Sequence, residues 1–203
     1  MRKIAVTEFN SVDGVIEDPH LWHFPFFDEG AAGYKMQELI NTGALLLGRT
    51  TYEGFASAWP ERGRDMAGQP EPTDTSDGEA YFTDRFNWLP KYVVSDSLTE
   101  DKATWNNSHI IRGNEIEDRL GQLKQEDGKD ILIHGSGKLI NSLLSTGLID
   151  EYRLMVHPIV VGNGQKLFPD GLPETTLQLV DTVTYPKGVI VLTYAPAAAN
   201  PEA

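Results

Sequence analysis

The sequence predicts a single α/β domain, with a mostly parallel central sheet flanked by helices and an antiparallel hairpin at the C-terminal end. Strand-like apolar segments alternate with segments of helical periodicity over most of the chain. Several of the apolar segments are continuous, which is typical of strands buried on both faces. The last part of the chain instead alternates apolar and polar residues on both sides of Pro186-Lys187-Gly188, which is typical of a hairpin.

Length and composition fit one globular domain and exclude several classes of partner. A chain of 203 residues is long enough for one hydrophobic core and short for two. It carries 17 Lys and Arg against 30 Asp and Glu, a formal charge of −13, and it has no basic stripe, so we expect no nucleic-acid partner. Its longest apolar runs, such as residues 44–47, are far shorter than the ~18 residues that cross a bilayer, so we expect no membrane partner.

The chain contains no cysteine, which excludes disulfides, thiolate metal sites and a cysteine nucleophile. The start Met1-Arg2-Lys3 resembles that of a signal peptide, but Glu8 and Asn10 interrupt the apolar segment that follows. We therefore expect a cytoplasmic protein. His20 and His23 lie three residues apart without an evident third ligand, so we expect no metal site.

The first half of the chain predicts alternating strands and helices around one long loop. The expected elements are a strand over residues 3–9, a helix over 31–40, a buried strand over 44–47, a helix capped by Thr50 or Thr51, a short helix over 84–87 and a strand over 91–94. The helix over 31–40 ends at Asn41-Thr42-Gly43, as at a C-terminal glycine stop. Residues 61–79 are rich in Gly and Pro and poor in large apolar residues, so we interpret them as an exposed loop.

The second half continues this alternation and then changes character. We expect strands over 108–111, 130–134 and 152–161, the last broken or bulged at Pro158, and helices that begin near Ile116 and Leu139. Residues 177–185 and 189–194 form the predicted hairpin. We place the single domain at 1–194 and a frayed tail at 195–203.

Three strand ends carry residues suited to a phosphorylated ligand. In parallel sheets, ligands bind beyond the carboxyl ends of the strands, where helix N-termini offer free N–H groups. Residues 48–51, 95–97 and 135–138 supply small residues, hydroxyl groups and a few cations at such ends, which favours a dinucleotide. The third segment also fits an ordinary tight turn. It lacks the third glycine of the dinucleotide fingerprint because position 140 is Ile, and it matches neither a P-loop nor a serine nucleophile elbow.

The order of several motifs resembles one known family. These motifs are Ser11-Val12-Asp13-Gly14, Leu46-Leu47-Gly48-Arg49-Thr50-Thr51-Tyr52-Glu53, Tyr92-Val93-Val94-Ser95, Ile133-His134-Gly135-Ser136-Gly137-Lys138-Leu139, Gly147-Leu148-Ile149-Asp150-Glu151 and Pro158-Ile159-Val160-Val161-Gly162-Asn163-Gly164 with Leu167-Phe168. Over nearly the whole chain they resemble the dihydrofolate reductase superfamily. Within it, they are most similar to the reductase domain of bacterial riboflavin biosynthesis, the RibD C-terminal domain, and its stand-alone relatives.

The resemblance implies a dihydrofolate-reductase-like fold with NADPH as cofactor. In that family the Gly-Arg-x-Thr and Gly-x-Gly elements grip the diphosphate, and the serine after the third strand lies near the adenosine 2′-phosphate. The matching cofactor-binding residues here are Gly48, Arg49, Thr50, Thr51, Ser95, Gly135, Ser136, Gly137 and Lys138. Arg49 and Lys138 would bring cations near the phosphates. The alternative for both is an ordinary solvated surface charge.

The resemblance also implies substrate-side residues. Asp13 matches the Ser-x-Asp-Gly turn whose aspartate faces the substrate, and we assign it the catalytic role, although Asp-Gly turns are also common without a function. The segment Trp22–Asp28 is similar to the run that holds the pteridine ring, with one extra residue before the aspartate. Trp22, Phe27 and Asp28 are therefore our substrate-binding candidates. Asp28 could equally cap the next helix, and the aromatic residues could equally be core.

We therefore expect an NADPH-dependent oxidoreductase that transfers hydride to a C=N or C=O carbon of a small planar heterocycle. One alternative is a non-catalytic small-ligand or nucleotide-binding module on the same fold. Another is a true dihydrofolate or riboflavin-pathway reductase, although a chain without cysteine lacks the zinc deaminase often fused to the latter. By resemblance we expect a homodimer that pairs near the terminal hairpin, with Val189–Tyr194 as an exposed edge strand.

Overall fold

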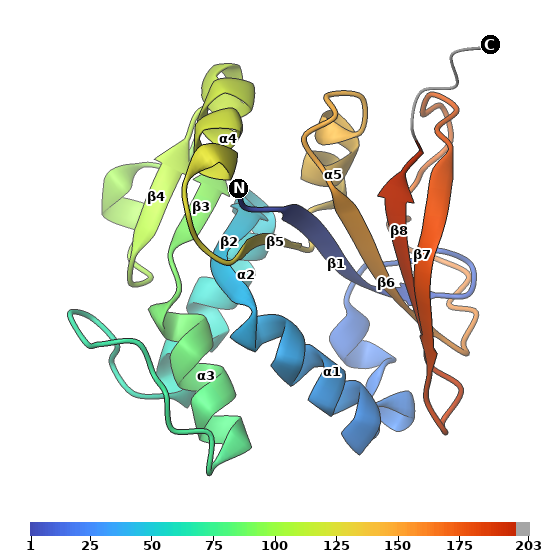
Figure 1. Ribbon diagram of the computed structural model, residues 1–203, viewed down its shortest axis with the longest axis horizontal. Coiled ribbons are helices and arrows are strands. Elements are labelled where there is room, and N and C mark those ends of the chain that lie inside the picture. The colour runs from blue at the N-terminus through green and yellow to red at the C-terminus, as the bar shows by residue number, and fades with distance from the viewer. Residues whose placement is uncertain (198–203) are drawn as a thin grey trace.

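The computed structural model describes residues 1–197 and contains one eight-stranded sheet with helices on both faces (Figure 1). The strands are β1 (Ile4–Ser11), β2 (Thr42–Gly48), β3 (Lys91–Val94), β4 (Ser108–Ile111), β5 (Asp130–His134), β6 (Glu151–His157), β7 (Leu177–Thr184) and β8 (Ile190–Pro196). The helices are α1 (Glu29–Ile40), α2 (Arg49–Ala58), α3 (Gly78–Trp88), α4 (Ile116–Gln125) and α5 (Gly137–Leu143).

The strand order is β4-β3-β2-β5-β1-β6-β8-β7. Every neighbouring pair from β4 to β6 is parallel, whereas β8 pairs antiparallel with both β6 and β7. The predicted fold class is therefore confirmed. The parallel strands also bring the ends of β3, β2, β5 and β1 to one edge of the sheet, in that order, and this is the edge where the candidate motifs lie.

Several boundaries differ from the sequence prediction. The strand expected over 152–161 ends at His157, because Pro158 has no N–H to donate to a neighbouring strand. Helix α2 begins at Arg49 with Gly48 as its N-cap residue, so neither Thr50 nor Thr51 caps it. The helix expected over 84–87 is the end of the longer α3.

The C-terminal hairpin requires the other corrections. The strand Val189–Tyr194, expected at the edge, corresponds to β8, which lies between β6 and β7; the edge strand is β7. Ala195 and Pro196, expected in the frayed tail, still pair with β7. The rest of the expected tail, residues 198–203, lies outside the described residues.

The two faces of the sheet have separate cores. Ile4 and Val6 of β1 pack on the side of α4 and α5, together with Leu120 and Leu139. Ala5 packs on the opposite side, in the core that α2 and α3 cover. Residues of β1 therefore alternate between the two faces, as the period of a strand requires, and its polar residues follow the same alternation toward the strand's end.

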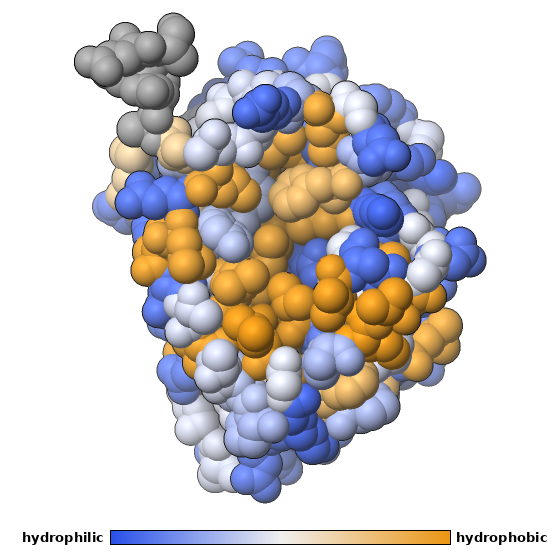
Figure 2. All heavy atoms as spheres, turned by 90° about the vertical axis from the view of Figure 1, so that its right-hand side faces the viewer, coloured by the Kyte–Doolittle hydropathy of each residue, from blue (hydrophilic) through white to orange (hydrophobic). Residues whose placement is uncertain are grey.

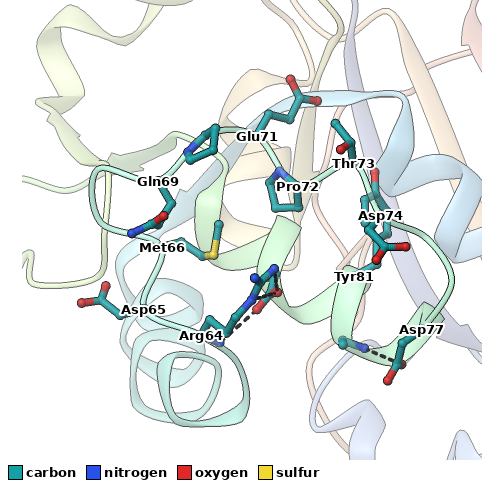
Figure 3. Close-up of a pocket in the computed structure, with 13 residues that line it drawn as sticks. Arg64, Asp65, Met66, Gln69, Glu71, Pro72, Thr73, Asp74, Asp77 and Tyr81 are labelled. Atoms are coloured by element: carbon teal, nitrogen blue, oxygen red, sulfur yellow. Dashed lines mark hydrogen bonds and ion pairs between the residues drawn. The ribbon is translucent and has the colours of Figure 1, made fainter.

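The segment 63–77, within the expected exposed loop, is fastened to α3 and encloses an open hollow of about 600 Å³ against it. Arg64 pairs with Asp84 at 2.6 Å, and Met66 is buried (Figure 3). The buried guanidinium of Arg85 donates to Glu71 at 2.5 Å and to the backbone oxygens of Leu39 and Thr42 at 3.0 and 2.7 Å. Arg85 thus joins α3, the loop and the C-terminal end of α1.

Candidate functional site

The ends of β2 and β5 are joined by hydrogen bonds through one hydroxyl group. The backbone N–H of Gly48 donates to the Oγ of Ser136 at 2.7 Å, and the hydroxyl groups of Thr51 and Ser136 lie 2.7 Å apart. Two motifs more than eighty residues apart in the sequence therefore share one edge of the sheet. This arrangement, which we call the Ser136 latch, means that Ser136 and Thr51 position the two turns by binding each other.

Glycine is required at these turns because neighbouring side chains approach the backbone so closely. A Cβ at Gly48 would lie 2.6 Å from the Oγ of Ser136. Gly135 has φ +62°, and a Cβ there would lie 3.0 Å from the side chain of Thr51. A Cβ at Gly137 would lie 2.9 Å from the Nε2 of Gln165. The three glycines therefore allow side chains of the protein to pack directly against the backbone of both turns.

The cations and free N–H groups of the two turns face solvent. Helix α2 starts at Arg49 without a side-chain cap, so its first N–H groups are free to bind an anion. Arg49 is half exposed and lies 3.8 Å from Glu53 one turn later. Thr50 and Lys138 are also exposed. Around the Ser136 latch, two cations and one helix N-terminus are therefore accessible in a protein that is otherwise strongly acidic.

Ser95 shapes the turn after β3. Its Oγ accepts hydrogen bonds from the backbone N–H groups of Ser97 and Leu98 at 3.2 and 2.9 Å. Arg112 fastens the same turn from outside by donating to the backbone oxygens of Ser95 and Leu98. The Ser95 hydroxyl proton remains available, because the hydrogen bonds from Ser97 and Leu98 use the hydroxyl oxygen only as an acceptor.

Asp13 is held in place by three hydrogen bonds. Its carboxylate accepts from the hydroxyl group of Ser11 at 2.6 Å and from the backbone N–H groups of Val161 and Gly162 at 3.1 and 2.8 Å. The Ser11 and Gly162 hydrogen bonds lower the pKa of Asp13 to about 2. Asp13 connects the turn after β1 to the segment after β6. It is ionised at neutral pH and is therefore unsuited to the role of proton donor.

Asp28 caps α1 and keeps one oxygen free. Its Oδ1 accepts from the backbone N–H of Ala31 at 2.9 Å, as the capping alternative predicted. Its Oδ2 is buried and has no hydrogen-bond partner. One carboxylate oxygen thus serves the helix, and the other is available to a ligand with an N–H or O–H group.

Trp22 and Phe27 belong to an aromatic cluster at the end of β1. The ring of Trp22 lies edge-on to the buried His157 at 5.4 Å, and its indole N–H donates to the backbone oxygen of Glu17. Phe27 packs against Phe9 of β1 at 5.8 Å between ring centroids. The cluster connects the segment before α1 to β1 and β6, so both residues contribute to packing.

A buried polar cluster at the same end of the molecule was missed by the sequence analysis. Lys35 of α1 donates to Thr7 of β1 at 2.6 Å and pairs with the buried carboxylate of Glu38. Beside this group, burial and the charge of Lys35 hold the pKa of His134 well below its ordinary range. The charged Glu8 within an apolar strand and Lys35 within a helix were the available signals, because charged residues are almost never buried without a reason.

Among the described residues, buried side-chain atoms without a hydrogen-bond partner concentrate around β1, although one of them, the Oε1 of Glu38, lies 3.7 Å from Arg153 in an ion pair. Six such side-chain atoms occur in all, and five of them belong to Glu8, Asn10, Asp28, Glu38 and His157. These residues lie on β1, on its neighbour β6, or on α1 and its cap. Since buried polar groups are normally hydrogen-bonded, this concentration favours a ligand-binding region.

Residues 1–197 bring no three His, Asp or Glu side chains into an arrangement that could hold a metal ion. Over the same part of the chain, no helix has both the length and the apolar character needed to cross a bilayer. The hollow beside α3 shares no lining residue with the Ser136 latch or with the polar cluster. The candidate site therefore consists of the strand ends and the residues around β1.

Comparisons with known proteins agree with this geometry. Residues 2–191 match the model of the RibD C-terminal domain family. In Bacillus subtilis, the uncharacterized protein YwjB is 30% identical over 93% of this chain and 95% of its own length. The uncharacterized protein YyaP of the same organism is 36% identical over 51% of this chain, and the match spans only 53% of YyaP.

Solved structures share the fold at low sequence identity. A putative riboflavin biosynthesis protein from Shewanella has a TM-score of 0.67 at 18% identity, with 97% of this chain and 99% of that chain covered. Dihydrofolate reductase from Enterococcus faecalis, solved with NADP(H), has a TM-score of 0.60 at 16% identity, with 97% of each chain covered. The expected dihydrofolate-reductase-like fold is confirmed, and the chain belongs to the RibD C-terminal domain family.

Proposed function

We propose that this protein is an NADPH-dependent reductase that transfers hydride to a C=N or C=O carbon of a small, planar heterocyclic substrate. The observation that carries the proposal is the Ser136 latch, which joins two glycine-containing turns with accessible N–H groups and cations. Membership of a family named for a riboflavin-pathway reductase supports the same function. The fold shared with a dihydrofolate reductase solved with NADP(H) is consistent with it.

The residues at the strand ends fit this cofactor. Gly48, Gly135 and Gly137 would keep the two turns packed closely together beside the diphosphate, and Arg49 and Lys138 would balance its charge. Thr50 is exposed beside them, whereas Thr51 and Ser136 would keep the two turns together. Ser95 would lie nearest to the adenosine 2′-phosphate. When bound, NADPH supplies the hydride; the protein supplies orientation and a site from which water is excluded.

The substrate would lie at the carboxyl end of β1, beside the segment that precedes α1. Phe9 and Phe27 would offer aromatic surface there for a flat ring, and the free Oδ2 of Asp28 would offer an acceptor. Trp22, which is buried against His157, would hold this segment in place. The charge of Lys35 and the neutral ring of His134 lie beyond these residues. We keep Asp13 in the site as a positioning residue, because its three hydrogen bonds hold the turn that follows β1.

The test is a titration with NADPH, followed through the fluorescence of the four tryptophans. We expect saturable quenching by NADPH, and weaker binding in the double variant Arg49→Gln/Lys138→Gln. The variant Lys187→Gln, in the hairpin turn, is a matched control for loss of positive charge and should bind as the native protein does. Absence of saturable binding at about millimolar NADPH, a Kd that corresponds to only ~4 kcal/mol, would refute the proposed function.

The second candidate is a ligand-binding module that binds the cofactor without turnover. The ionised state of Asp13 favours it, because the carboxylate to which we assigned catalysis cannot donate a proton at neutral pH. NADPH oxidation should be followed with pterins, ribosylaminopyrimidines, quinones and nitroaromatics. Turnover of any of them supports the reductase, and turnover of dihydrofolate or a ribosylaminopyrimidine would identify a pathway enzyme. Stoichiometric NADPH binding without oxidation throughout supports the module.

A further inference from the structure

Two unpartnered polar atoms lie on the same face of β1, beside the Ser136 latch. They are the Oε1 of Glu8 and the Oδ1 of Asn10, both buried and without a hydrogen-bond partner. Because the two residues are two positions apart in a strand, their side chains point to the same face. Glu8 is 6% exposed and Asn10 is 5% exposed, so neither group is exposed enough for bulk water to satisfy it.

The strand register places Glu8 in the same row as the glycines of the two turns. Val6 of β1 pairs with Ile133 of β5, and Ile133 pairs with Leu46 of β2. Glu8 and Gly48 lie two residues further along β1 and β2, and Gly135 is the first residue after β5. The carboxyl group of Glu8 therefore lies at the same level of the sheet edge as the turns that would hold the diphosphate, one strand beyond the turn at Gly135.

This step rests on the proposed function. The order of the strands then predicts which part of the cofactor lies beside Glu8. A cofactor whose 2′-phosphate lies near Ser95 after β3, and whose diphosphate lies at the ends of β2 and β5, runs along the sheet edge toward β1. Neighbouring strands are about 4.8 Å apart, so the end of β1 is the next position along the edge after the diphosphate. The nicotinamide end of the molecule would reach it.

We infer that Glu8 and Asn10 hold the carboxamide group of the nicotinamide, the Glu8 carboxyl donating to its oxygen and the Asn10 amide oxygen accepting from its nitrogen. A carboxamide presents its oxygen, an acceptor, and one of its two N–H donors on the same edge. A carboxyl group that carries its proton and an amide oxygen complement these atoms. The pair would satisfy both orphaned atoms at once.

The protonation of Glu8 supports this assignment. Burial raises its pKa to about 8, although the charge of Lys35 and the backbone N–H of Gly135 pull it downward. Lys35 of α1 lies on the opposite face of β1, bonded to Thr7, and acts on Glu8 only through its charge. His134 is in register with Thr7, and β6 contributes the apolar Leu154 in register with Glu8. At neutral pH, Glu8 is thus mostly a hydrogen-bond donor, which the carboxamide oxygen requires.

This role predicts in which direction pH changes the relative affinities for NADPH and NADP⁺. Above about pH 8, Glu8 loses its proton and can no longer donate to the carboxamide, so NADPH should bind more weakly. The same negative charge attracts the positively charged ring of NADP⁺. The ratio of NADPH affinity to NADP⁺ affinity should therefore fall as the pH rises from about 6.5 to 9, by about tenfold if one hydrogen bond of ~1.4 kcal/mol is lost.

The experiment measures Kd for NADPH, NADP⁺ and ADP-ribose 2′-phosphate, which lacks the nicotinamide, at pH values on both sides of about 8. Glu8→Gln keeps a donor and should make the NADPH to NADP⁺ ratio independent of pH. Glu8→Leu should weaken NADPH binding by about three- to tenfold and leave the fragment unaffected. Glu117→Gln, an exposed glutamate of α4, is the control and should match the native protein.

The outcomes separate this inference from the proposed function. If the native protein binds none of the three probes, the proposed function fails, and this assignment fails with it. If all three bind but the ratio does not change with pH, or changes equally in Glu8→Gln, the cofactor site stands and the role of Glu8 is wrong. Should Glu8→Leu not fold, Glu8→Gln and the native protein alone decide the question.

Discussion

Ser136 has a backbone conformation that few side chains adopt, with φ 69°, and its hydroxyl group joins two segments. We predict that Ser136→Ala weakens NADPH binding by about tenfold, or ~1.4 kcal/mol, because the Gly48 N–H loses its partner and the turns are no longer joined. Titration by tryptophan fluorescence measures the effect.

The matched control for this prediction is Ser142→Ala. Ser142 lies in α5, and its hydroxyl group donates only to the backbone oxygen of Leu139 within the same helix. Its replacement should leave the NADPH affinity unchanged. Equal affinities of the Ser136 and Ser142 variants would show that the Ser136 latch does not organise the cofactor site.

The buried acid on β1 also makes stability depend on pH. The pKa of Glu8 is about 8 in the folded protein against an ordinary value of 4.5, so the folded state binds more protons than the unfolded state between these values. Its contribution to the free energy of unfolding is therefore greatest at low pH and decreases as the pH rises toward and through 8. The shift corresponds to about 5 kcal/mol at most, since one pKa unit is about 1.4 kcal/mol.

Urea denaturation of the native protein and of Glu8→Gln measures this contribution. The difference in unfolding free energy between the two proteins should change in favour of the variant as the pH rises from about 5 to 9. Subtracting the variant removes the pH dependence that all other carboxyl groups contribute, including that of Asp13. A difference that stays constant over this range would show that Glu8 has an ordinary pKa.

At the scale of the elements, Arg85 joins α3 to the end of α1. It is buried, and its guanidinium donates to the carbonyl groups of Leu39 at the end of α1 and of Thr42 at the start of β2, and to Glu71 of the loop. We predict that Arg85→Leu lowers the unfolding free energy by about 3–5 kcal/mol, because Glu71 and the carbonyl groups lose their partner. Arg62→Leu, at an exposed position, should cost less than about 1 kcal/mol.

Thermal or urea denaturation of both variants tests this prediction. Limited proteolysis offers a second readout, since the segment 63–77 should be cleaved faster once Glu71 is released. If Arg85→Leu were as stable as Arg62→Leu, the contacts of Arg85 would have no net effect on stability.

The sequence predicted the bounds of helices and strands best where one or both faces of the element were apolar. The strands over 91–94, 108–111 and 130–134 were predicted with the bounds that the structure shows. The β8 strand was placed at the edge because alternation shows that one face is buried but does not show which strands are neighbours. The start of α2 was missed because its N-cap is Gly48, where hydroxyl residues usually serve.

The candidate site was predictable in part. Motif order found the two turns, yet it could not show that Ser136 and Thr51 bind each other, because that contact depends on the sheet order. Glu8 was visible only as a charge that interrupts an apolar segment. Its burial depends on the packing against the face of β1 that carries Val6, and the burial of Lys35 depends on how α1 packs on the opposite face; no local pattern records either.

At the scale of the whole molecule, the face formed by the C-terminal hairpin is rich in exposed apolar side chains. Figure 2 shows these side chains gathered on the side of the molecule where β7 and β8 lie. Leu179 is 51% exposed and Val180 is 60% exposed on the edge strand β7, and Ile190 of β8 is 37% exposed. Exposed apolar patches of this kind commonly mark interfaces.

We predict a homodimer that uses this face, with a mass of about twice the 22.5 kDa of one chain. Leu179→Lys/Val180→Lys should produce a monomer, because charge on an edge strand opposes pairing with another chain. Light scattering after gel filtration measures the mass. Val12→Lys, an exposed apolar residue in the turn after β1, is the control and should leave the dimer intact. A native protein that elutes as a monomer contradicts the prediction.

The alternation along β1 has a consequence for sequence change. Thr7 and Phe9 face α1, whereas Glu8 and Asn10 face the row of the two turns. A single residue deleted between Ile4 and Glu8 would exchange these two sets, turning the acid toward Lys35 and the aromatic ring toward the dinucleotide. A substitution within this strand therefore alters one surface at a time, whereas a change of its length would reverse both surfaces in one step.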